Sequence, residues 1–194
     1  MPTFTMMVGL PGSGKSTLAQ TLCEDTGAKH ISSDDIRHEI FGNAEDVDHN
    51  GEVFDIMRKR TKEALSSGQS VVYDATNLSQ KRRIGLLQEL SKIQCRKIVV
   101  VMATPYDDCI RRNMSRERHV PIAVIEKMRE GFHIPSKYEG WDAVYIDYPY
   151  DCVINTRKDF LYDSMDFNQE NKNHTATLGQ HCYLTKLGVL CYND

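Results

Sequence analysis

Hydrophobic and polar residues follow two alternating patterns along the first 150 residues of the chain. Short apolar runs of strand length alternate with segments whose apolar residues recur every three or four positions, as on one face of a helix. This alternation predicts an α/β fold of three layers, with a mostly parallel sheet and helices on both of its faces. Strands are expected at 4–8, 29–32, 70–74, 97–102 and 144–146, and helices from 18 onward and at 34–41, 52–66, 80–93, 106–114 and 121–132.

The pattern changes toward the end of the chain. Residues 152–154 are expected to be extended, 166–177 are polar and rich in asparagine, and a short helix is expected at 178–190. We therefore expect one domain over residues 1–158, followed by a polar linker and a short helical tail over residues 159–194.

The segment between the first strand and the first helix carries the most specific spacing. Residues 9–17, Gly-Leu-Pro-Gly-Ser-Gly-Lys-Ser-Thr, fit the phosphate-binding loop pattern G-x-x-x-x-G-K-[ST]. Its glycines let backbone N–H groups curl around phosphates, and the N-terminus of the following helix favours the same anion. Lys15 would neutralise the β- and γ-phosphates and the Ser16 hydroxyl would hold Mg²⁺, whereas a glycine-rich turn with a solvated lysine is the alternative. The residues expected to bind the nucleotide are Gly9, Pro11, Gly12, Ser13, Gly14, Lys15, Ser16 and Thr17.

Two more polar clusters follow expected strands at their carboxyl ends, where open parallel sheets bind ligands. Asp34 and Asp35, together with Arg37, would supply a base for an attacking hydroxyl and a cation for a phosphate of the acceptor. Capping of a helix by Asp34, with Arg37 as a surface partner, is the alternative. Asp74 ends the third strand, where a carboxylate reaches the Mg²⁺ region directly or through water, and a turn or helix cap is its alternative.

The fourth cluster is basic and lies on an expected helix. Residues 111–119 contain four arginines and one glutamate, and Arg112 and Arg116 are one helical turn apart. An arginine carried by a mobile lid would stabilise the charge that develops on a transferring phosphoryl group, whereas a solvated charged face is the alternative. Residues 81–83, Lys-Arg-Arg, form a weaker basic patch, either on the surface or against the backbone of the acceptor.

Composition narrows the expected partners. The 194 residues carry a net charge of −3, so a contact with nucleic acid would be local rather than a matter of bulk charge. No apolar run is long enough to span a membrane, and no signal-sequence pattern precedes the first strand. The six cysteines are scattered, which favours reduced thiols in a cytoplasmic protein over zinc ligands or disulfides. The sequence leaves the oligomeric state open.

Taken in order, these clusters resemble the polynucleotide 5′-hydroxyl kinase branch of the P-loop kinases. The resemblance covers about residues 3–135. It implies an adenylate-kinase-like P-loop fold with an arginine-bearing lid, which uses ATP and Mg²⁺ to phosphorylate the 5′-hydroxyl ends of RNA or DNA. The stretches that carry it are Gly9 to Thr17, Asp34-Asp35-Ile36-Arg37, Thr76-Asn77-Leu78 with Arg82-Arg83, Arg112-Asn113 with Arg116, and Val120-Pro121-Ile122.

The resemblance also implies roles for individual side chains around the strand ends. Asp34 would be the general base, and Arg37 would bind a phosphate of the acceptor. Lys15 and Ser16 would serve ATP and Mg²⁺. Asp74 stands one position away from the pattern of the kinase branch, although a carboxylate is frequent there in the wider family, so it is assigned only to the Mg²⁺ region.

The lid arginines receive roles in the same way. Arg116 would touch the transferring phosphate, and Arg112 would lie near the base or phosphates of the nucleotide. The spacing between Arg116 and Val120 differs from that of the kinase branch, so Arg118 is a rival to Arg116.

The tail carries a second, weaker resemblance. Residues 174–181, His-Thr-Ala-Thr-Leu-Gly-Gln-His, look like the opening of an HD-type metal phosphohydrolase domain, in which His181 would be the first metal ligand. The remaining ligands of such a domain have no room before Asp194, so the tail would be a truncated or degenerate remnant. A lone surface histidine on a short helix is the alternative.

Three functions compete on these residues. The first is an ATP-dependent kinase of 5′-hydroxyl ends, for which the sequence does not separate RNA from DNA. The second is a P-loop kinase of a small metabolite or nucleoside, because fold and loop alone do not distinguish the two. The third is a nucleotide-binding module without catalysis, which the combination of loop, base and lid disfavours.

Overall fold

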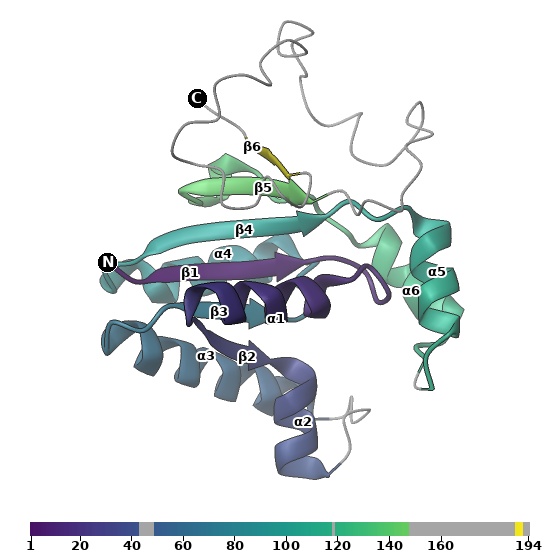
Figure 1. The fold of residues 1–194 in the computed structure, drawn as a ribbon, viewed down its shortest axis with the longest axis horizontal. Helices are drawn as coiled ribbons and strands as arrows, with labels where there is room; N and C mark the ends of the chain where they lie inside the picture. Colours follow the sequence, from purple (N-terminus) through teal and green to yellow (C-terminus); the bar gives the residue numbers. More distant parts are fainter. Residues whose placement is uncertain (43–48, 118, 148–188, 192–194) are drawn as a thin grey trace, which may run out of the picture.

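The computed structural model describes residues 1–42, 49–117, 119–147 and 189–191. These residues form one sheet in the order β2-β3-β1-β4-β5-β6, in which β1 to β5 are parallel and β6 runs antiparallel to β5 (Figure 1). The predicted, mostly parallel sheet is confirmed. The strands are β1 Thr3–Val8, β2 Lys29–Ser32, β3 Val71–Asp74, β4 Arg96–Met102, β5 Ala143–Asp147 and β6 Val189–Cys191.

Helices connect these strands, as the apolar periodicity predicted. The element expected at 34–41 is a nine-residue helix, and the long helix expected at 80–93 ends in a 3₁₀ turn. The helices of the described residues are α1 Lys15–Thr26, α2 Ser33–Phe41, α3 Asn50–Ser66, α4 Gln80–Glu89, α5 Tyr106–Met114 and α6 Ile122–Glu130, with short 3₁₀ helices η1 Leu90–Lys92 and η2 Lys137–Glu139.

A separate apolar cluster covers each face of the sheet, because alternate residues of a strand point to opposite faces. On one face, Met7 of β1 packs with Leu18 of α1. On the other face, Phe4 of β1 belongs to a larger cluster that includes Met57 of α3 and Leu87 of α4. Figure 1 shows α1 in front of the sheet and α4 behind it, which is the three-layer arrangement that the sequence predicted.

The strand order brings the carboxyl ends of three strands together. β3 pairs with β1 on one side, with Tyr73 opposite Met6, and with β2 on the other, with Asp74 opposite Ser32. Because these strands are parallel, the phosphate-binding loop, the start of α2 and the end of β3 all emerge at one edge of the sheet. The chain then crosses to β4 on the far side of β1, and parallel sheets bind ligands at such switch points.

Two expectations for the second half of the chain are wrong. α5 ends at Met114, so the basic residues from Ser115 onward lie in the loop before α6 and not on a helix. Val189–Cys191 form strand β6 against the edge of β5, so the helix expected at 178–190 is wrong at its last two residues. The open edge of β5 supplies backbone hydrogen-bond partners that local periodicity does not reveal. The rest of that helix, the segment 152–154 and the boundary at 158 lie outside the described residues.

Cys23, Cys95 and Cys109 are free thiols, as their scattered spacing predicted. Within the described ranges, every helix is too short or too polar to cross a membrane.

Asp147, the last residue of β5, makes stability depend on pH. The residue is only 5% exposed, and burial raises the pKa of its carboxyl from 3.8 to about 6. Between these values the folded state binds more protons than the unfolded state, so the free energy of unfolding falls as the pH rises. Because asparagine has no carboxyl to ionise, we expect Asp147→Asn to raise the free energy of unfolding at pH 7 by about 1–3 kcal/mol. Urea denaturation at pH 5 and pH 8 checks this, and a stability difference from wild type that does not change with pH would refute it.

Candidate active site

The phosphate-binding loop joins β1 to α1 and is held from two sides. The Gly9 N–H donates to the Thr76 carbonyl over 3.1 Å, and the Thr104 hydroxyl donates to the Ser13 carbonyl over 2.7 Å. Gly14 precedes α1 with φ at 91°, in the left-handed region that side chains disfavour. The loop therefore passes directly into a helix N-terminus, which is the setting that binds phosphate anions.

Gly12 packs against α5 more closely than any side chain allows. It has φ at 81°, and a Cβ there would overlap with the carbonyl oxygen of Cys109. Gly12→Ala is therefore expected to lower the free energy of unfolding by about 2–4 kcal/mol and to abolish ATP binding.

Gly27→Ala is the matched control for that substitution. Gly27 also has a positive φ, 68°, but nothing lies within 4 Å of a Cβ built there. We expect this variant to lose only about 1–2 kcal/mol and to bind ATP normally. Urea denaturation and calorimetric titration with ATP measure both effects, and equal losses in the two variants would rule out a special role for the approach to α5.

Asp74 lies beside the loop as a buried charge. Only 3% of its side chain is exposed, and its Oδ2 lies 3.4 Å from Nε2 of His30. Burial acts to raise the pKa of Asp74, but His30, Lys15 and Ser16 outweigh burial and hold the pKa below its usual value. Asp74 is thus an ionised carboxylate next to the two loop residues that the motif assigns to phosphate and Mg²⁺.

The oxygen atoms around Asp74 suit Mg²⁺. Its second oxygen, Oδ1, is buried and has no hydrogen-bond partner among the described residues. The Ser16 hydroxyl supplies another oxygen nearby. In the described ranges, no three His, Cys, Asp or Glu side chains gather into a metal site. The Asp74 and Ser16 oxygens fit Mg²⁺, which is bound by one or two protein oxygens together with phosphates and waters.

Asp34 lies in the first turn of α2, at the same edge. Ser32 Oγ accepts from the Asp35 N–H at 3.3 Å, so Ser32 caps this helix and the alternative role of Asp34 as its cap is wrong. The Asp34 side chain is 60% exposed, and its Oδ1 accepts a 2.8 Å hydrogen bond from Arg37 Nη1. Arg37 is only 11% exposed and also donates to Asn50 Oδ1 over 2.6 Å. A fixed arginine therefore holds a carboxylate that solvent and ligands can reach.

The predicted lid arginines are divided between α5 and the loop after it. A Cβ built on Gly14 would lie 3.8 Å from Nη1 of Arg112, so this guanidinium reaches the phosphate-binding loop. Arg116 is exposed in the loop, and Arg118 lies outside the described residues. The expectation that Arg112 and Arg116 share a helical face is wrong, because α5 ends at Met114.

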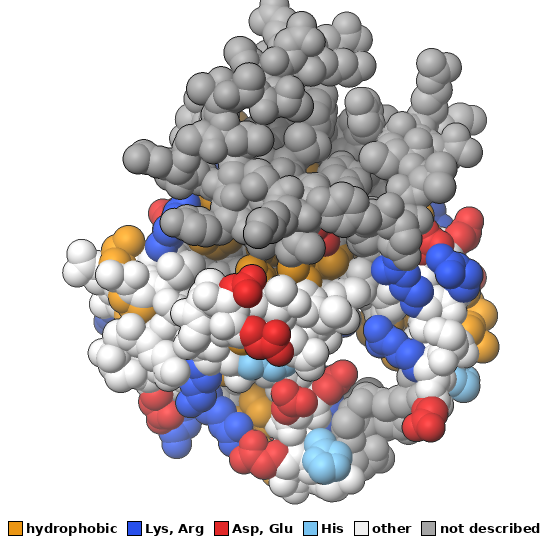
Figure 2. Space-filling model, viewed as in Figure 1, with side chains coloured by type: hydrophobic (Ala, Val, Ile, Leu, Met, Phe, Trp, Pro, Cys, Tyr) orange, Lys and Arg blue, Asp and Glu red, His pale blue; other side chains and the backbone are white. Residues whose placement is uncertain are grey.

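One buried amide closes the loop between α5 and α6. Asn113 Nδ2 donates to the Val120 carbonyl over 2.8 Å, and its Oδ1 accepts from the Val120 N–H at 3.0 Å. Residues 114–117 are exposed beyond this closure. Figure 2 shows Lys and Arg side chains over α5 on one side of a hollow, and Asp and Glu side chains over α2 on the other. Cations thus lie across this hollow from the acidic side chains over α2.

Comparison with known families decides what kind of domain holds this site. The sequence profile AAA_33, described as an AAA domain, matches residues 4–135, which is more than half of the chain. The chain belongs to the AAA_33 family of P-loop kinases. The match covers the phosphate-binding loop, both carboxylates at the strand ends and the lid arginines.

Curated relatives of this AAA_33 chain are kinases. The L-seryl-tRNA(Sec) kinase of Methanococcus maripaludis is 27% identical over 175 residues, which cover 87% of this chain and 66% of the relative. An adenylate kinase of Thermotoga neapolitana is 30% identical over 105 residues, 54% of this chain and 41% of the relative. The chain therefore spans less than two thirds of the length of these relatives.

Solved structures share the AAA_33 chain's fold. A sugar kinase from Janibacter sp. HTCC2649 has a TM-score of 0.58 at 16% identity, covering 76% of this chain and 86% of that one. A chain of the Pnkp1/Rnl/Hen1 RNA repair complex has a TM-score of 0.57 at 22% identity, covering 67% of this chain and 43% of that one. The predicted P-loop kinase fold is confirmed. The comparisons give no support to the HD-type resemblance of the tail, and residues 174–181 lie outside the described residues.

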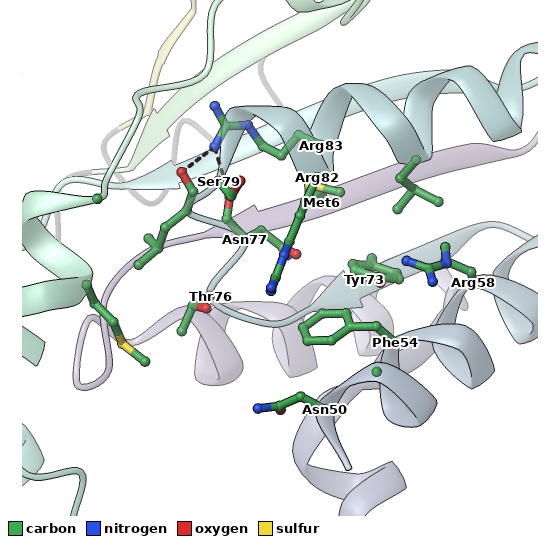
Figure 3. A pocket seen from close by; sticks show the side chains of 15 residues that line it. Met6, Asn50, Phe54, Arg58, Tyr73, Thr76, Asn77, Ser79, Arg82 and Arg83 are labelled. Carbon is green, nitrogen blue, oxygen red and sulfur yellow. Dashed lines mark hydrogen bonds between the residues drawn. The ribbon is translucent and has the colours of Figure 1, made fainter. Parts of the chain in front are cut away.

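Sequence reasoning missed how this AAA_33 domain holds the turn after β3. Arg83, expected on the surface or against the acceptor, is buried in an ion pair with Glu139 at 2.6 Å. Its Nη1 donates to the carbonyls of Asn77 and Leu78, each at 2.9 Å (Figure 3). The expectation for Arg83 is wrong because these carbonyls and Glu139 satisfy the guanidinium inside the protein.

His30 also carried no signal in the sequence. It contacts Asp74 through Nε2, and its Nδ1 lies 3.7 Å from Asp35 Oδ2. The hydrogen bond with Asp74 raises the pKa of His30, although burial acts in the opposite direction. This histidine became a neighbour of the site because β2 pairs with β3, which no local pattern specifies.

Proposed function

We propose that this chain is an ATP- and Mg²⁺-dependent kinase that transfers the γ-phosphoryl group of ATP to 5′-hydroxyl ends of RNA or DNA. The observation that carries the proposal is an exposed, arginine-held carboxylate, Asp34, at the same sheet edge as the phosphate-binding loop. A module that only binds nucleotide does not require such a carboxylate. A kinase needs one to receive the proton of the attacking hydroxyl.

The donor half of the proposed site lies around the loop. Lys15 and the backbone N–H groups of the loop hold the β- and γ-phosphates, and Ser16 and Asp74 hold Mg²⁺. When bound, this ion neutralises charge on the phosphates. Arg112, beside Gly14, adds a cation, and Arg116 reaches the transferring phosphate from the lid.

The acceptor half lies around the start of α2. Asp34 accepts the hydroxyl proton while the hydroxyl oxygen forms a bond to the γ-phosphorus and the bond to the β-phosphate oxygen breaks, so that ADP leaves. Arg37, held in place by Asn50, orients Asp34 and presents positive charge to a phosphate of the acceptor. Catalysis by such a site consists of positioning and charge stabilisation.

Support for a nucleic-acid acceptor comes from the motifs and from one relative. The stretches around Asp34, Thr76 and Val120 resemble those of polynucleotide 5′-hydroxyl kinases. The relative matched over 87% of this chain is named for L-seryl-tRNA, an acceptor that contains RNA.

Transfer of labelled phosphate from ATP tests this function. The acceptors are RNA and DNA oligonucleotides with a 5′-hydroxyl, and the same oligonucleotides with a 5′-phosphate are the matched control. We expect label on the 5′-hydroxyl oligonucleotides only. Transfer to a nucleoside or sugar with none to any oligonucleotide would overturn the proposal.

A kinase of a small metabolite or nucleoside is the second candidate. The net charge of −3 and the adenylate kinase relatives favour it, because a small acceptor needs no extended basic surface. The same labelled-ATP assay with nucleosides, nucleoside monophosphates and sugar acids distinguishes this candidate from the first. ATP binding without transfer to any acceptor would instead support a non-catalytic module.

A further inference from the structure

A pocket of about 430 Å³ adjoins the candidate active site. Its walls come from α3, the turn after β3, α4 and the end of α6 (Figure 3). One wall residue, Asn50, also accepts the hydrogen bond from Arg37, which in turn donates to Asp34. The pocket therefore begins two hydrogen bonds away from the proposed base, where the body of an acceptor would lie.

The charge of the pocket favours an anion. Its lining contains three arginines and no aspartate or glutamate. Arg83 is paired with Glu139, and Arg58 lies 3.6 Å from Glu89, so acidic partners already neutralise both. Arg82 has no acidic partner within the part of the chain that the structure describes, and its side chain is exposed. Its guanidinium is available to a negatively charged group of a ligand.

The wall next to Arg82 is aromatic. The Arg82 guanidinium lies over the ring of Phe54, 5.8 Å from its centre, and both side chains are directed into the same space (Figure 3). Phe54 is half-buried and packs against the apolar core, which holds its ring in place. A flat aromatic ring of a ligand gains stacking energy from such a surface.

Two amide side chains of the pocket are already engaged within the protein. Asn77 already donates to the carbonyls of Met7 and Ala75, at 2.7 and 3.2 Å. Asn50 is engaged by Arg37.

We propose that this pocket binds the terminal nucleobase of the acceptor, stacked on Phe54, while Arg82 binds the phosphate that follows it. The inference rests on the proposed function and adds the residues that set specificity for a nucleotide end. It assigns Phe54 to the base and Arg82 to the backbone, so the two contacts are separable by experiment.

Steady-state kinetics with two acceptors tests the role of Phe54. The acceptors are a 5′-hydroxyl trinucleotide and the same trinucleotide with an abasic first position. Phe54→Leu should raise the KM for the normal acceptor by about tenfold or more, with kcat and the KM for ATP unchanged. It should not raise the KM for the abasic acceptor, because that acceptor has no base to stack. Phe54→Tyr keeps an aromatic ring and should retain the wild-type KM.

Arg82→Gln tests the backbone contact with the same two acceptors. It should raise the KM for both by a similar factor, since both carry the phosphate, and it should make the KM less sensitive to salt. Lys92→Gln is the matched control, because it removes one positive charge from η1 at an exposed residue that does not line the pocket. Its kinetics should equal those of wild type.

Two results would overturn the pocket assignment while the proposed function stands. One is an equal effect of Phe54→Leu on the normal and abasic acceptors, and the other is an unchanged KM for both. If Phe54→Leu does not fold, Phe54→Trp replaces it, with a lowered KM expected only for the normal acceptor.

If the wild type phosphorylates no oligonucleotide, the proposed function fails by itself. Calorimetric titration with the trinucleotide then decides the pocket. Binding that weakens in Phe54→Leu or strengthens in Phe54→Trp supports it, whereas absent or Phe54-independent binding overturns it.

Discussion

Asp34→Asn is expected to lower the rate of phosphoryl transfer by about 10²–10⁴-fold while ATP binding stays intact. Asparagine keeps the size of the side chain and its contact with Arg37, but its amide does not accept the hydroxyl proton. The loss should therefore appear in kcat. It is measured with whichever 5′-hydroxyl oligonucleotide, RNA or DNA, is the better acceptor. Single-turnover transfer of labelled phosphate measures the rate, and calorimetry measures ATP binding.

Asp35→Asn is the matched control for this prediction. Asp35 is the adjacent carboxylate in α2, but its side chain is directed to His30, at 3.7 Å, and not to Arg37. This variant should keep a rate within a few-fold of wild type. If Asp34→Asn retains wild-type activity, or if Asp35→Asn is the variant that loses it, Asp34 is not the base.

Arg83→Met should be the most destabilising single substitution among those considered. It leaves the Glu139 carboxylate, whose side chain is fully buried, without its cation, and it leaves the carbonyls of Asn77 and Leu78 without their donor. Removing one partner of a buried ion pair costs about 3–5 kcal/mol. We expect a loss of that size in the free energy of unfolding, measured by urea denaturation.

Two comparisons sharpen that expectation. The double variant Arg83→Met/Glu139→Leu should recover part of the loss, because it removes the unpaired charge as well. Glu39→Gln is the matched control on the surface. Glu39 forms an exposed ion pair with Arg60 that, like the buried pair, has two hydrogen bonds, at 2.7 and 2.6 Å. This substitution should have little effect on stability, because water replaces the lost contacts. A loss for Arg83→Met no larger than that for Glu39→Gln would show that burial of the pair is unimportant.

The Arg83–Glu139 ion pair is also connected to the candidate active site. It holds the turn after β3 through Asn77, whose side chain donates to the Met7 carbonyl of β1. The neighbouring Thr76 carbonyl accepts from Gly9 at the start of the phosphate-binding loop. One buried network therefore fixes the turn that lines the acceptor pocket relative to the loop that would bind the donor.

Local patterns were sufficient for the elements and for the donor loop. The bounds predicted for β2 and α5, 29–32 and 106–114, are those of the structure, because apolar periodicity and flanking turn residues act over a few positions. The phosphate-binding loop is likewise a contiguous segment, and the spacing of its glycines and lysine by itself indicates phosphate binding. Asp34 and Asp74 could be named because the ends of expected strands are readable from the same periodicity.

The tertiary structure alone decided which side chains meet around those residues. Arg83 and Glu139 are 56 residues apart, and His30 and Asp74 are 44 apart. The same applies to the contact between Arg82 and Phe54, which joins α4 to α3. These contacts depend on the order of the strands and on which helices cover each face, and the apolar pattern of a single segment is the same whatever its neighbours are. The sequence by itself thus determined the α/β fold and the phosphate-binding loop, whereas only the packing of distant segments decided the surroundings of the candidate base and the pocket beside it.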